Sequence, residues 1–197
     1  MGAPAQRDPS TSSYYVGDAF YAALVRAFTD WDRDERAIAD PARRDAVRAF
    51  LEREARLLDR GDYAAWLAMF APECAYWVPG TPERGDPSRE ITVAFHDRRQ
   101  LEDRVYRLGT GYAWSQAPAS RTVRSVSNVE LFATGDAGIV MVRSNFLIAE
   151  LLDGELRHWA GWAGHRLETT GDGFSILAKQ VNLIDCDRNL RNPSITL

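Results

Sequence analysis

Hydrophobic residues near the start of the chain recur at helical spacing. Phe20, Leu24 and Phe28 follow one another at four-residue intervals, which predicts a helix around them. The apolar stripe of this helix can pack on the same domain or on a neighbouring chain. The residues before it are mostly small or polar. We therefore expect an N-terminal arm with one helix over residues 1–40 and a single domain over residues 41–197.

Capping residues predict three further helices. Asp40-Pro41 starts the first of them, because Asp can accept main-chain N–H groups of the opening turn and Pro suits the first helical position. Gly61 ends this helix. Asp62 caps a short helix that follows, and Asp97 caps a helix over residues 98–108.

The period of apolar residues changes to two after Ser120, which predicts strands. A short strand, residues 74–79, already follows Phe70, which we place in the short helix. Four long strands are expected over residues 121–132, 139–151, 155–168 and 174–185. The turns between them contain Asp-Gly or Gly-Asp, so consecutive strands pair as an antiparallel meander. Helices followed by a curved meander predict an α+β fold with the helices on the concave face of the sheet.

Polar and apolar residues alternate on one side of several predicted strands. The polar members are Arg124 and Asn128 on the first long strand, Arg143 and Asn145 on the second, and Gln180 and Asn182 on the fourth. Such a mixed face is typical of a wet, specific protein contact. An ordinary solvated sheet face has the same pattern, so both interpretations stay open.

Charge and composition narrow the possible partners and compartment. The net charge of -4 argues against nucleic acid, because phosphate binding needs a concentrated basic surface. No apolar run approaches the length of a membrane span, and residues 1–13 lack the features of a signal peptide. Cys74 and Cys186 stand far apart and fit free thiols in a reducing compartment. We expect a cytoplasmic protein with neither a membrane nor a nucleic-acid partner.

The histidines and cysteines do not form a recognisable metal or cofactor motif. The chain has three histidines, His96, His158 and His165. The last two share a predicted strand at an odd separation, which puts them on opposite faces. A Rieske cluster needs paired Cys and His motifs, and nucleotide binding needs a Gly-rich loop; the sequence has neither. We therefore assign no catalytic, cofactor-binding or metal-binding residue.

An acid–base pair is the main enzymatic alternative. His96-Asp97 stands beside a loop and His165 lies in the middle of a predicted strand. An α+β domain with an open mouth can pair a His with an Asp or a Tyr, as dehydratases and isomerases do. The structural interpretation is that Asp97 caps the following helix and His96 is its neighbour. For His158 and His165 the structural interpretation is a polar strand position that faces solvent or a partner.

Several motifs follow one another in a characteristic order over about residues 45–197. They are EREARLLDRGDYAAWLAMFAPECAYWVP, Arg104-Val105-Tyr106-Arg107-Leu108, Gly111-Tyr112-Ala113-Trp114, Pro118-Ala119-Ser120-Arg121, Asn128-Val129 and the ending ILAKQVNLIDCDRNLRNPSITL. Their order and spacing resemble the β (small) subunit of Rieske-type aromatic-ring-hydroxylating dioxygenases, the biphenyl, benzoate and naphthalene dioxygenase group. His96 departs from the pattern, since members often carry an acidic residue there.

The resemblance implies a fold, a role and a set of partners. The fold is the nuclear-transport-factor-2-like cone that scytalone dehydratase and ketosteroid isomerase share. The small subunit assembles with a large α subunit as an α3β3 hexamer with contacts between β subunits. The α subunit holds the Rieske [2Fe–2S] cluster and a mononuclear iron, and NAD(P)H supplies electrons through a reductase. The small subunit itself is structural and carries no cofactor.

We therefore expect a non-catalytic subunit of an oxidoreductase that dihydroxylates an aromatic compound. The residues expected at subunit contacts are Asp97, Arg98, Arg104, Arg107, Trp114, Arg121, Arg124 and Asn128. The alternatives are a stand-alone dehydratase or isomerase with a His/Asp pair, and a module that binds a small ligand. An inward-pointing His or carboxylate with a partner in hydrogen-bond reach would favour an enzyme.

Overall fold

A computed structural model describes residues 17–197, except residues 83–84, 111–112, 117, 172 and 191. The helices are α1 (Asp18–Ala27), α2 (Pro41–Asp59), α3 (Tyr63–Leu67) and α4 (Arg98–Gly109), with short 3-10 turns η1 (Asp34–Arg36) and η2 (Trp114–Gln116). The strands are β1 (Phe70–Pro79), β2 (Thr92–Asp97), β3 (Arg121–Ala133), β4 (Ile139–Leu152), β5 (Glu155–Thr170) and β6 (Gly173–Leu183). Residues 1–16 of the expected N-terminal arm lie outside the described residues.

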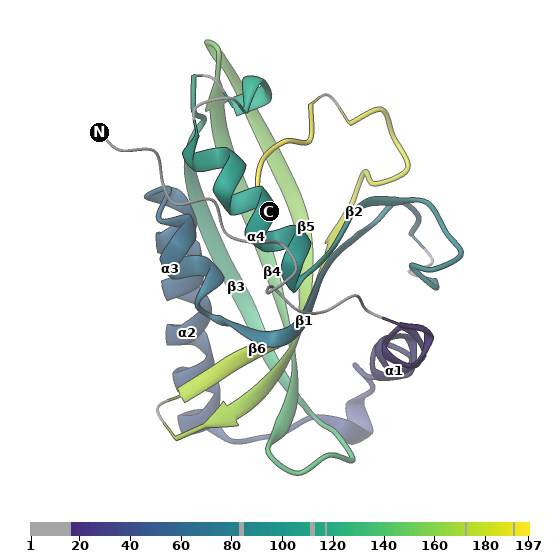
Figure 1. Ribbon diagram of the computed structural model, residues 1–197. Helices are drawn as coiled ribbons and strands as arrows, with labels where there is room; N and C mark the ends of the chain where they lie inside the picture. Colours follow the sequence, from purple (N-terminus) through teal and green to yellow (C-terminus); the bar gives the residue numbers. More distant parts are fainter. Residues whose placement is uncertain (1–16, 83–84, 111–112, 117, 172, 191) are drawn as a thin grey trace.

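The strands form one twisted sheet in the order β2-β1-β6-β5-β4-β3 (Figure 1). Strands β3 to β6 pair consecutively and antiparallel, which confirms the predicted meander. Strands β1 and β6 differ, because they pair in parallel. This pairing places residues of β1 beside the last long strand.

Helices α2, α3 and α4 pack on one face of the sheet, here called the inner face (Figure 1). It carries Tyr76, Val142 and Ile148, which belong to the main hydrophobic core. Asp40 and Asp62 cap α2 and α3 through their side chains, as predicted. The α+β class and the placement of these three helices are therefore confirmed.

Helix α1 lies on the opposite, outer face, so the expectation that the helices share the concave face was wrong for this one. Leu24 packs there with Trp77 and Ala178. The chain after α1 buries Trp31 close to Gly164, where an added Cβ would come within 2.9 Å of the Trp31 ring. The apolar stripe of α1 thus packs on the same chain, which is the first of the two predicted alternatives.

The structure near β1 differs from the prediction in two ways. Phe70 begins β1 instead of ending the short helix, because it pairs with Ile176 of β6 and its ring packs 4.9 Å from that of Trp66. The register between β1 and β6 then shifts before Ala75. The edge strand β2 was not predicted at all; it pairs antiparallel with β1 and most of its side chains are half-buried.

Candidate functional site

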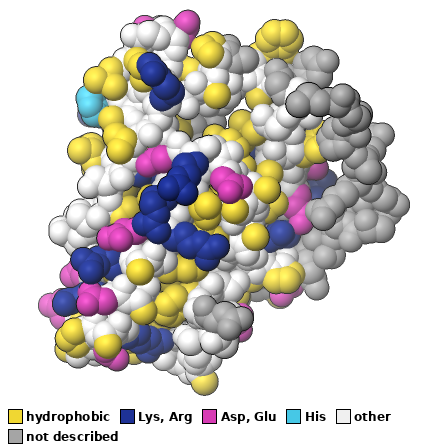
Figure 2. Space-filling model, turned by 90° about the vertical axis from the view of Figure 1, so that its left-hand side faces the viewer, with side chains coloured by type: hydrophobic (Ala, Val, Ile, Leu, Met, Phe, Trp, Pro, Cys, Tyr) yellow, Lys and Arg dark blue, Asp and Glu magenta, His cyan; other side chains and the backbone are white. Residues whose placement is uncertain are grey.

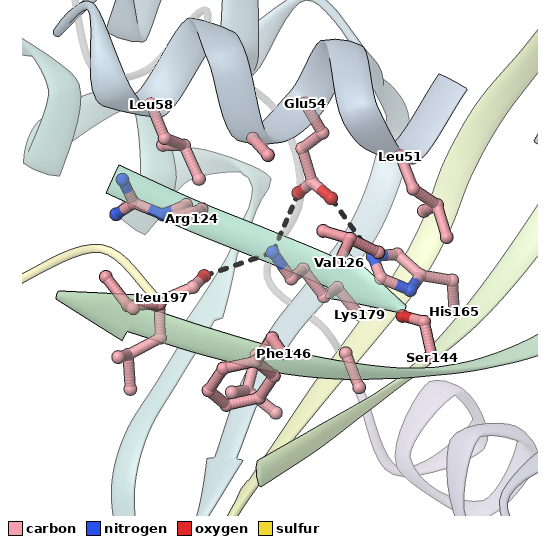
Figure 3. Close-up of a pocket in the computed structure, with 14 residues that line it drawn as sticks. Leu51, Glu54, Leu58, Arg124, Val126, Ser144, Phe146, His165, Lys179 and Leu197 are labelled. Carbon is pink, nitrogen blue, oxygen red and sulfur yellow. Dashed lines mark hydrogen bonds and ion pairs between the residues drawn. The ribbon is translucent and has the colours of Figure 1, made fainter. Parts of the chain in front are cut away.

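A small cavity lies between α2 and the inner face of the sheet (Figure 3). Its volume is about 40 Å³. Apolar side chains such as Leu51, Val126 and Phe146 form much of its wall. The wall also contains ionisable groups that come from α2, β5 and β6, and these make it the candidate site.

Glu54 enters the cavity from α2. The buried residues of that helix are Val47, Leu51, Glu54, Ala55 and Leu58, so Glu54 occupies a position on the apolar stripe. It is only 4% exposed. Its Oε1 accepts hydrogen bonds from Lys179 Nζ at 2.8 Å and from Trp66 Nε1 at 3.1 Å. The core therefore contains a carboxylate at a position where an apolar side chain would be expected.

Lys179 and His165 reach Glu54 from the sheet. They are directly opposite each other on β6 and β5, so their side chains project from the same face. Nε2 of His165 lies 3.2 Å from Oε2 of Glu54, and both sheet residues are less than a tenth exposed. Figure 3 shows the three side chains converging on one another from three elements. We call Glu54, Lys179 and His165 the interior cluster.

The charges of the interior cluster follow from its burial and contacts. Burial alone would raise the pKa of Glu54, but the charge of Lys179 and the hydrogen bonds from His165 and Lys179 outweigh it, and the pKa lies well below its usual range. Burial lowers the pKa of His165, although Glu54 opposes this shift. The cluster is therefore an ion pair with a neutral imidazole at neutral pH.

The protonation state also fixes the His165 tautomer. An ionised Glu54 can only accept, so Nε2 of His165 carries the proton and Nδ1 is left as an acceptor. Among the described residues, Nδ1 is buried without a hydrogen-bond partner. The expectation that His165 faces solvent or a partner was wrong. His158 is exposed, as expected of the opposite face of the strand.

An inward His with a carboxylate in hydrogen-bond reach is the geometry expected of an acid–base enzyme. The volume argues against a substrate there, because about 40 Å³ holds no more than a few water molecules. The cluster instead joins α2 to β5 and β6 through buried polar contacts. Its present geometry is that of a structural ion pair with an adjoining imidazole.

His96 and Asp97 do not form an acid–base pair at the cavity. Asp97 accepts from the main-chain N–H of Gln100 at 2.8 Å, and the Gln100 side chain accepts from that of Asp97 at 2.9 Å. This reciprocal arrangement is a capping box at the start of α4, which confirms the structural interpretation. The His96 ring stacks on Tyr76. Burial, Arg104 and Arg107 lower the pKa of His96 to about 4.

Half of the residues expected at subunit contacts are engaged within the chain. Asp97 caps α4, and Arg98 donates to the main-chain oxygens of Leu67 and Phe70. Arg124 pairs with Asp59 of α2, and Arg104 binds main-chain oxygens near residue 195. These contacts give each side chain an internal role, and their part in assembly stays a prediction.

The other half lies at the surface. Trp114 is 81% exposed, and Arg107, Arg121 and Asn128 are exposed as well. Asn128 has a positive φ of 51° and lies where the pairing of β3 with β4 shifts register. On the face shown in Figure 2, the central group of basic side chains has acidic side chains beside it, so that group does not form a continuous basic surface.

The predicted mixed polar face is divided between the two sides of the sheet. Arg124 of β3 lines the interior cavity. Arg143 of β4 lies on the outer face, with its guanidinium 4.8 Å from the ring centre of Trp162. Asn182 of β6 lines a separate outer depression with the same Trp162. Gln180 and Asn182 of β6 are buried while Asn128 of β3 is exposed, so the predicted polar residues do not form one external face.

The sequence reasoning missed Glu54 and Lys179. Both carried a signal: Glu54 stands at helical spacing between Leu51 and Leu58, and Lys179 alternates with Val181 and Leu183 on a strand. A charge at a core position needs a partner of opposite sign. Lys179 is also the one lysine of the chain.

The described residues do not fit a metal centre. No three His, Cys, Asp or Glu side chains within them lie close enough together to hold an ion. Cys74 and Cys186 are buried free thiols. No helix in the described part of the chain is both long and apolar enough to cross a membrane.

Comparison with protein families and known sequences gives consistent matches. The family model of the ring hydroxylating beta subunit matches residues 53–187. The beta subunit of toluate 1,2-dioxygenase from Pseudomonas putida is 35% identical over 71% of this chain and 88% of its own length. The small subunit of 2-halobenzoate 1,2-dioxygenase from Burkholderia cepacia is 33% identical over 70% of this chain and 86% of its own length.

Solved structures share the fold. The beta subunit of benzoate 1,2-dioxygenase from Burkholderia mallei superposes with a TM-score of 0.62 and 27% identity, over 76% of this chain and 95% of that one. A chain of naphthalene 1,2-dioxygenase with indole bound gives a TM-score of 0.71 at 21% identity, over 92% and 95% of the two chains. An NTF2-like protein with a cystatin-like fold also matches, with a TM-score of 0.53.

Proposed function

The chain belongs to the family of ring-hydroxylating β subunits, and on that premise we propose that it is the structural small subunit of an aromatic-ring-hydroxylating dioxygenase. Its relatives are the small subunits of toluate and halobenzoate dioxygenases. The catalytic site of such an oxidoreductase lies in the large α subunit. This chain supports that subunit in the dihydroxylation of an aromatic compound.

The interior of the cone has too little free space for a substrate, and this observation supports the structural role. The cavity of about 40 Å³ is smaller than an aromatic ring with its substituents requires. The Glu54, Lys179 and His165 side chains around it bind one another. The interior polar groups thus hold the subunit together. The Rieske cluster and the mononuclear iron belong to the α subunit, which receives electrons from NAD(P)H through a reductase.

A contact surface at one end of the outer sheet face supports the partner proposal. Exposed apolar side chains gather on adjacent strands there: Val123 on β3, Leu147 on β4 and Leu156 on β5. Arg121, one of the expected contact residues, lies opposite Leu151 in the same region. Apolar side chains beside exposed arginine are typical of protein interfaces. We assign this surface, together with Arg107, Trp114 and Asn128, to contacts in an α3β3 assembly that includes contacts between β subunits.

The division of the chain follows the same proposal. The cone domain would span residues 41–197, and the proposed arm over residues 1–40 would include α1, which lies on the outer sheet face. The assembly functions in the cytoplasm, where the buried thiols of Cys74 and Cys186 stay reduced.

Co-expression with a Rieske-type α subunit tests the proposal. The two chains should elute together in size-exclusion chromatography, with iron and dioxygenase turnover in the shared peak. The small subunit expressed alone should contain no stoichiometric iron and show no turnover. An α-independent small subunit that elutes alone from the co-expressed mixture would contradict the proposal.

The interior cluster is the one observation that favours a stand-alone dehydratase or isomerase. His165 and Glu54 point inward within 3.2 Å of each other, as an acid–base pair would. An enzyme of this kind also needs room for its substrate, and the cavity of about 40 Å³ does not provide it.

A further inference from the structure

Residues 194–197 close the cone, and buried contacts hold them in place. Its last three side chains, Ile195, Thr196 and Leu197, are 5%, 3% and 5% exposed. The segment has no regular secondary structure and pairs with no strand. Leu197 forms part of the wall of the interior cavity. The segment therefore occupies the space that would otherwise extend this cavity. We call residues 194–197 the plug.

Three cationic side chains donate hydrogen bonds to main-chain oxygens of the plug. Nη2 of Arg104 lies 2.8 Å from the oxygen of Ser194 and 3.0 Å from that of Ile195. Nη2 of Arg124 donates to the oxygen of Thr196. Nζ of Lys179 lies 3.0 Å from the oxygen of Leu197. Figure 3 shows this last contact beside the interior cluster.

Tyr76 of β1 also binds the plug. Its hydroxyl donates to the main-chain oxygen of Leu197 and accepts from the main-chain N–H of the same residue, both at 3.0 Å. Burial raises the pKa of Tyr76 to about 12, so the hydroxyl stays a neutral donor. All four of these side chains thus donate hydrogen bonds to main-chain oxygens of the plug, and we call them the seat: Arg104, Arg124, Lys179 and Tyr76.

Two of the three cations that bind the plug have carboxylate partners in the part of the chain that the structure describes, and Arg104 does not. Glu54 pairs with Lys179, and Asp59 pairs with Arg124. Within the described residues, no hydrogen bond or ion pair joins Arg104 to a carboxylate. Nε of Arg124 is buried and without a hydrogen-bond partner in the same part of the chain. The carbonyl oxygens of Ser194 and Ile195 are weaker partners for Arg104 than a carboxylate would be.

We propose that the plug occupies a binding site for a short carboxylate with an apolar tail. The donors would bind the carboxylate, and the apolar wall of Leu51, Leu58 and Phe146 would receive the tail. The main-chain oxygen and the isobutyl side chain of Leu197 imitate these two parts of the ligand. The site is closed while the plug is bound and opens when the plug leaves. This inference does not depend on the subunit role.

The ligand 4-methylpentanoate is the direct probe, because it combines a carboxylate with the apolar tail of leucine. In the full chain, the double variant Ile195→Gly, Leu197→Gly weakens the plug and keeps every donor. It should bind one equivalent of 4-methylpentanoate in calorimetry, at least about tenfold more tightly than the unchanged chain. The neutral 4-methylpentanol should not bind.

Two controls locate the binding. Asn192→Gly changes an exposed residue with positive φ just before the plug and should leave affinity at the level of the unchanged chain. Adding Arg104→Gln to the double variant should lower affinity about tenfold, since one cation of the seat is lost. A double variant that melts cooperatively but binds no 4-methylpentanoate would overturn the inference.

The unchanged chain provides a test that does not need the double variant to fold. Hydrogen exchange of the peptide that covers the plug should become several-fold faster when 4-methylpentanoate replaces an equal concentration of chloride. Exchange elsewhere in the core should stay the same, because the carboxylate competes with the plug alone. Plug exchange that is identical in the two salts would refute competition for the site.

Discussion

Glu54 compensates the buried positive charge of Lys179 in the interior of the protein. It is the carboxylate that pairs with the buried Lys179, and it also accepts from His165 and Trp66. Removing one member of a buried pair leaves the other charge without compensation, which costs more than the pair contributes. The residue therefore matters more for stability than its number of contacts implies.

Replacing Glu54 with Gln should lower the free energy of unfolding by about 3–5 kcal/mol, because Lys179 loses its ionic partner in a buried site. Urea unfolding would measure the loss. Glu52→Gln makes the same change at an exposed position of α2 and should cost less than about 0.5 kcal/mol. The double variant Glu54→Gln, Lys179→Met should lose less than the sum of the single variants. Additive losses would show that the two residues do not act as a pair.

His96 makes stability depend on pH. Its pKa falls from 6.5 to about 4 on folding, so the unfolded chain binds a proton between these values that the folded chain does not. The contribution of His96 is complete above pH 6.5 and is lost as the pH falls toward 4. His96→Asn should therefore flatten the pH dependence of unfolding in this window by at most about 1.4 kcal/mol per pH unit.

His158→Asn is the control for this pH effect, because His158 is exposed on the outer side of β5. Its unfolding free energy should follow that of the unchanged chain from pH 7 down to pH 4. Equal slopes for His96→Asn and the unchanged chain would contradict the assignment of the titration to His96.

At the scale of elements, α4 depends on the capping box at its start. Asp97→Ala removes the acceptor for the Gln100 main-chain N–H and should cost about 1 kcal/mol in urea unfolding. Asp97→Ser keeps an acceptor and should recover most of this loss. Asp103→Ala is the matched control, since Asp103 is exposed on the same helix. Equal losses for Asp97→Ala and Asp103→Ala would rule out a capping role.

The elements that could be predicted are those with a local signal. Capping residues located α2 and α4, and turn residues located the hairpins between β3 and β6. Strand β2 has no such signal, because its half-buried side chains do not alternate clearly and it pairs at the sheet edge. The side of the sheet that α1 covers was also beyond local reasoning, since apolar spacing does not tell which surface it meets.

At the scale of the whole molecule, the interior cluster could not be predicted because it is assembled by long-range pairing. Glu54 is separated from His165 by 111 residues and from Lys179 by 125. The pairing of β5 with β6 places the two sheet residues side by side, and α2 crosses above them. Sequence position alone indicated only that Glu54 and Lys179 stood on apolar faces. The family resemblance supplied the fold and role but not these contacts.

Assembly with the α subunit should depend on the exposed residues Arg107, Trp114 and Arg121. Truncating an exposed Trp or Arg that is buried in an interface removes about 2 kcal/mol of binding free energy, or roughly a thirtyfold change in affinity. Each change to Ala should therefore weaken co-elution with the α subunit in dilution series, while urea unfolding of the isolated small subunit stays the same.

Two exposed residues outside the proposed contact surface provide matched controls for this last prediction. The controls are Arg48→Ala and Ile91→Ala. Arg48 lies exposed on α2, and Ile91 lies before β2 with its side chain 85% exposed. Both should leave assembly unchanged, because a residue that stays in water contributes little to binding. If the Arg107 and Arg121 variants assemble as well as these controls, the arginines lie outside the interface. If Trp114→Ala does so too, the contact must use another surface of the cone.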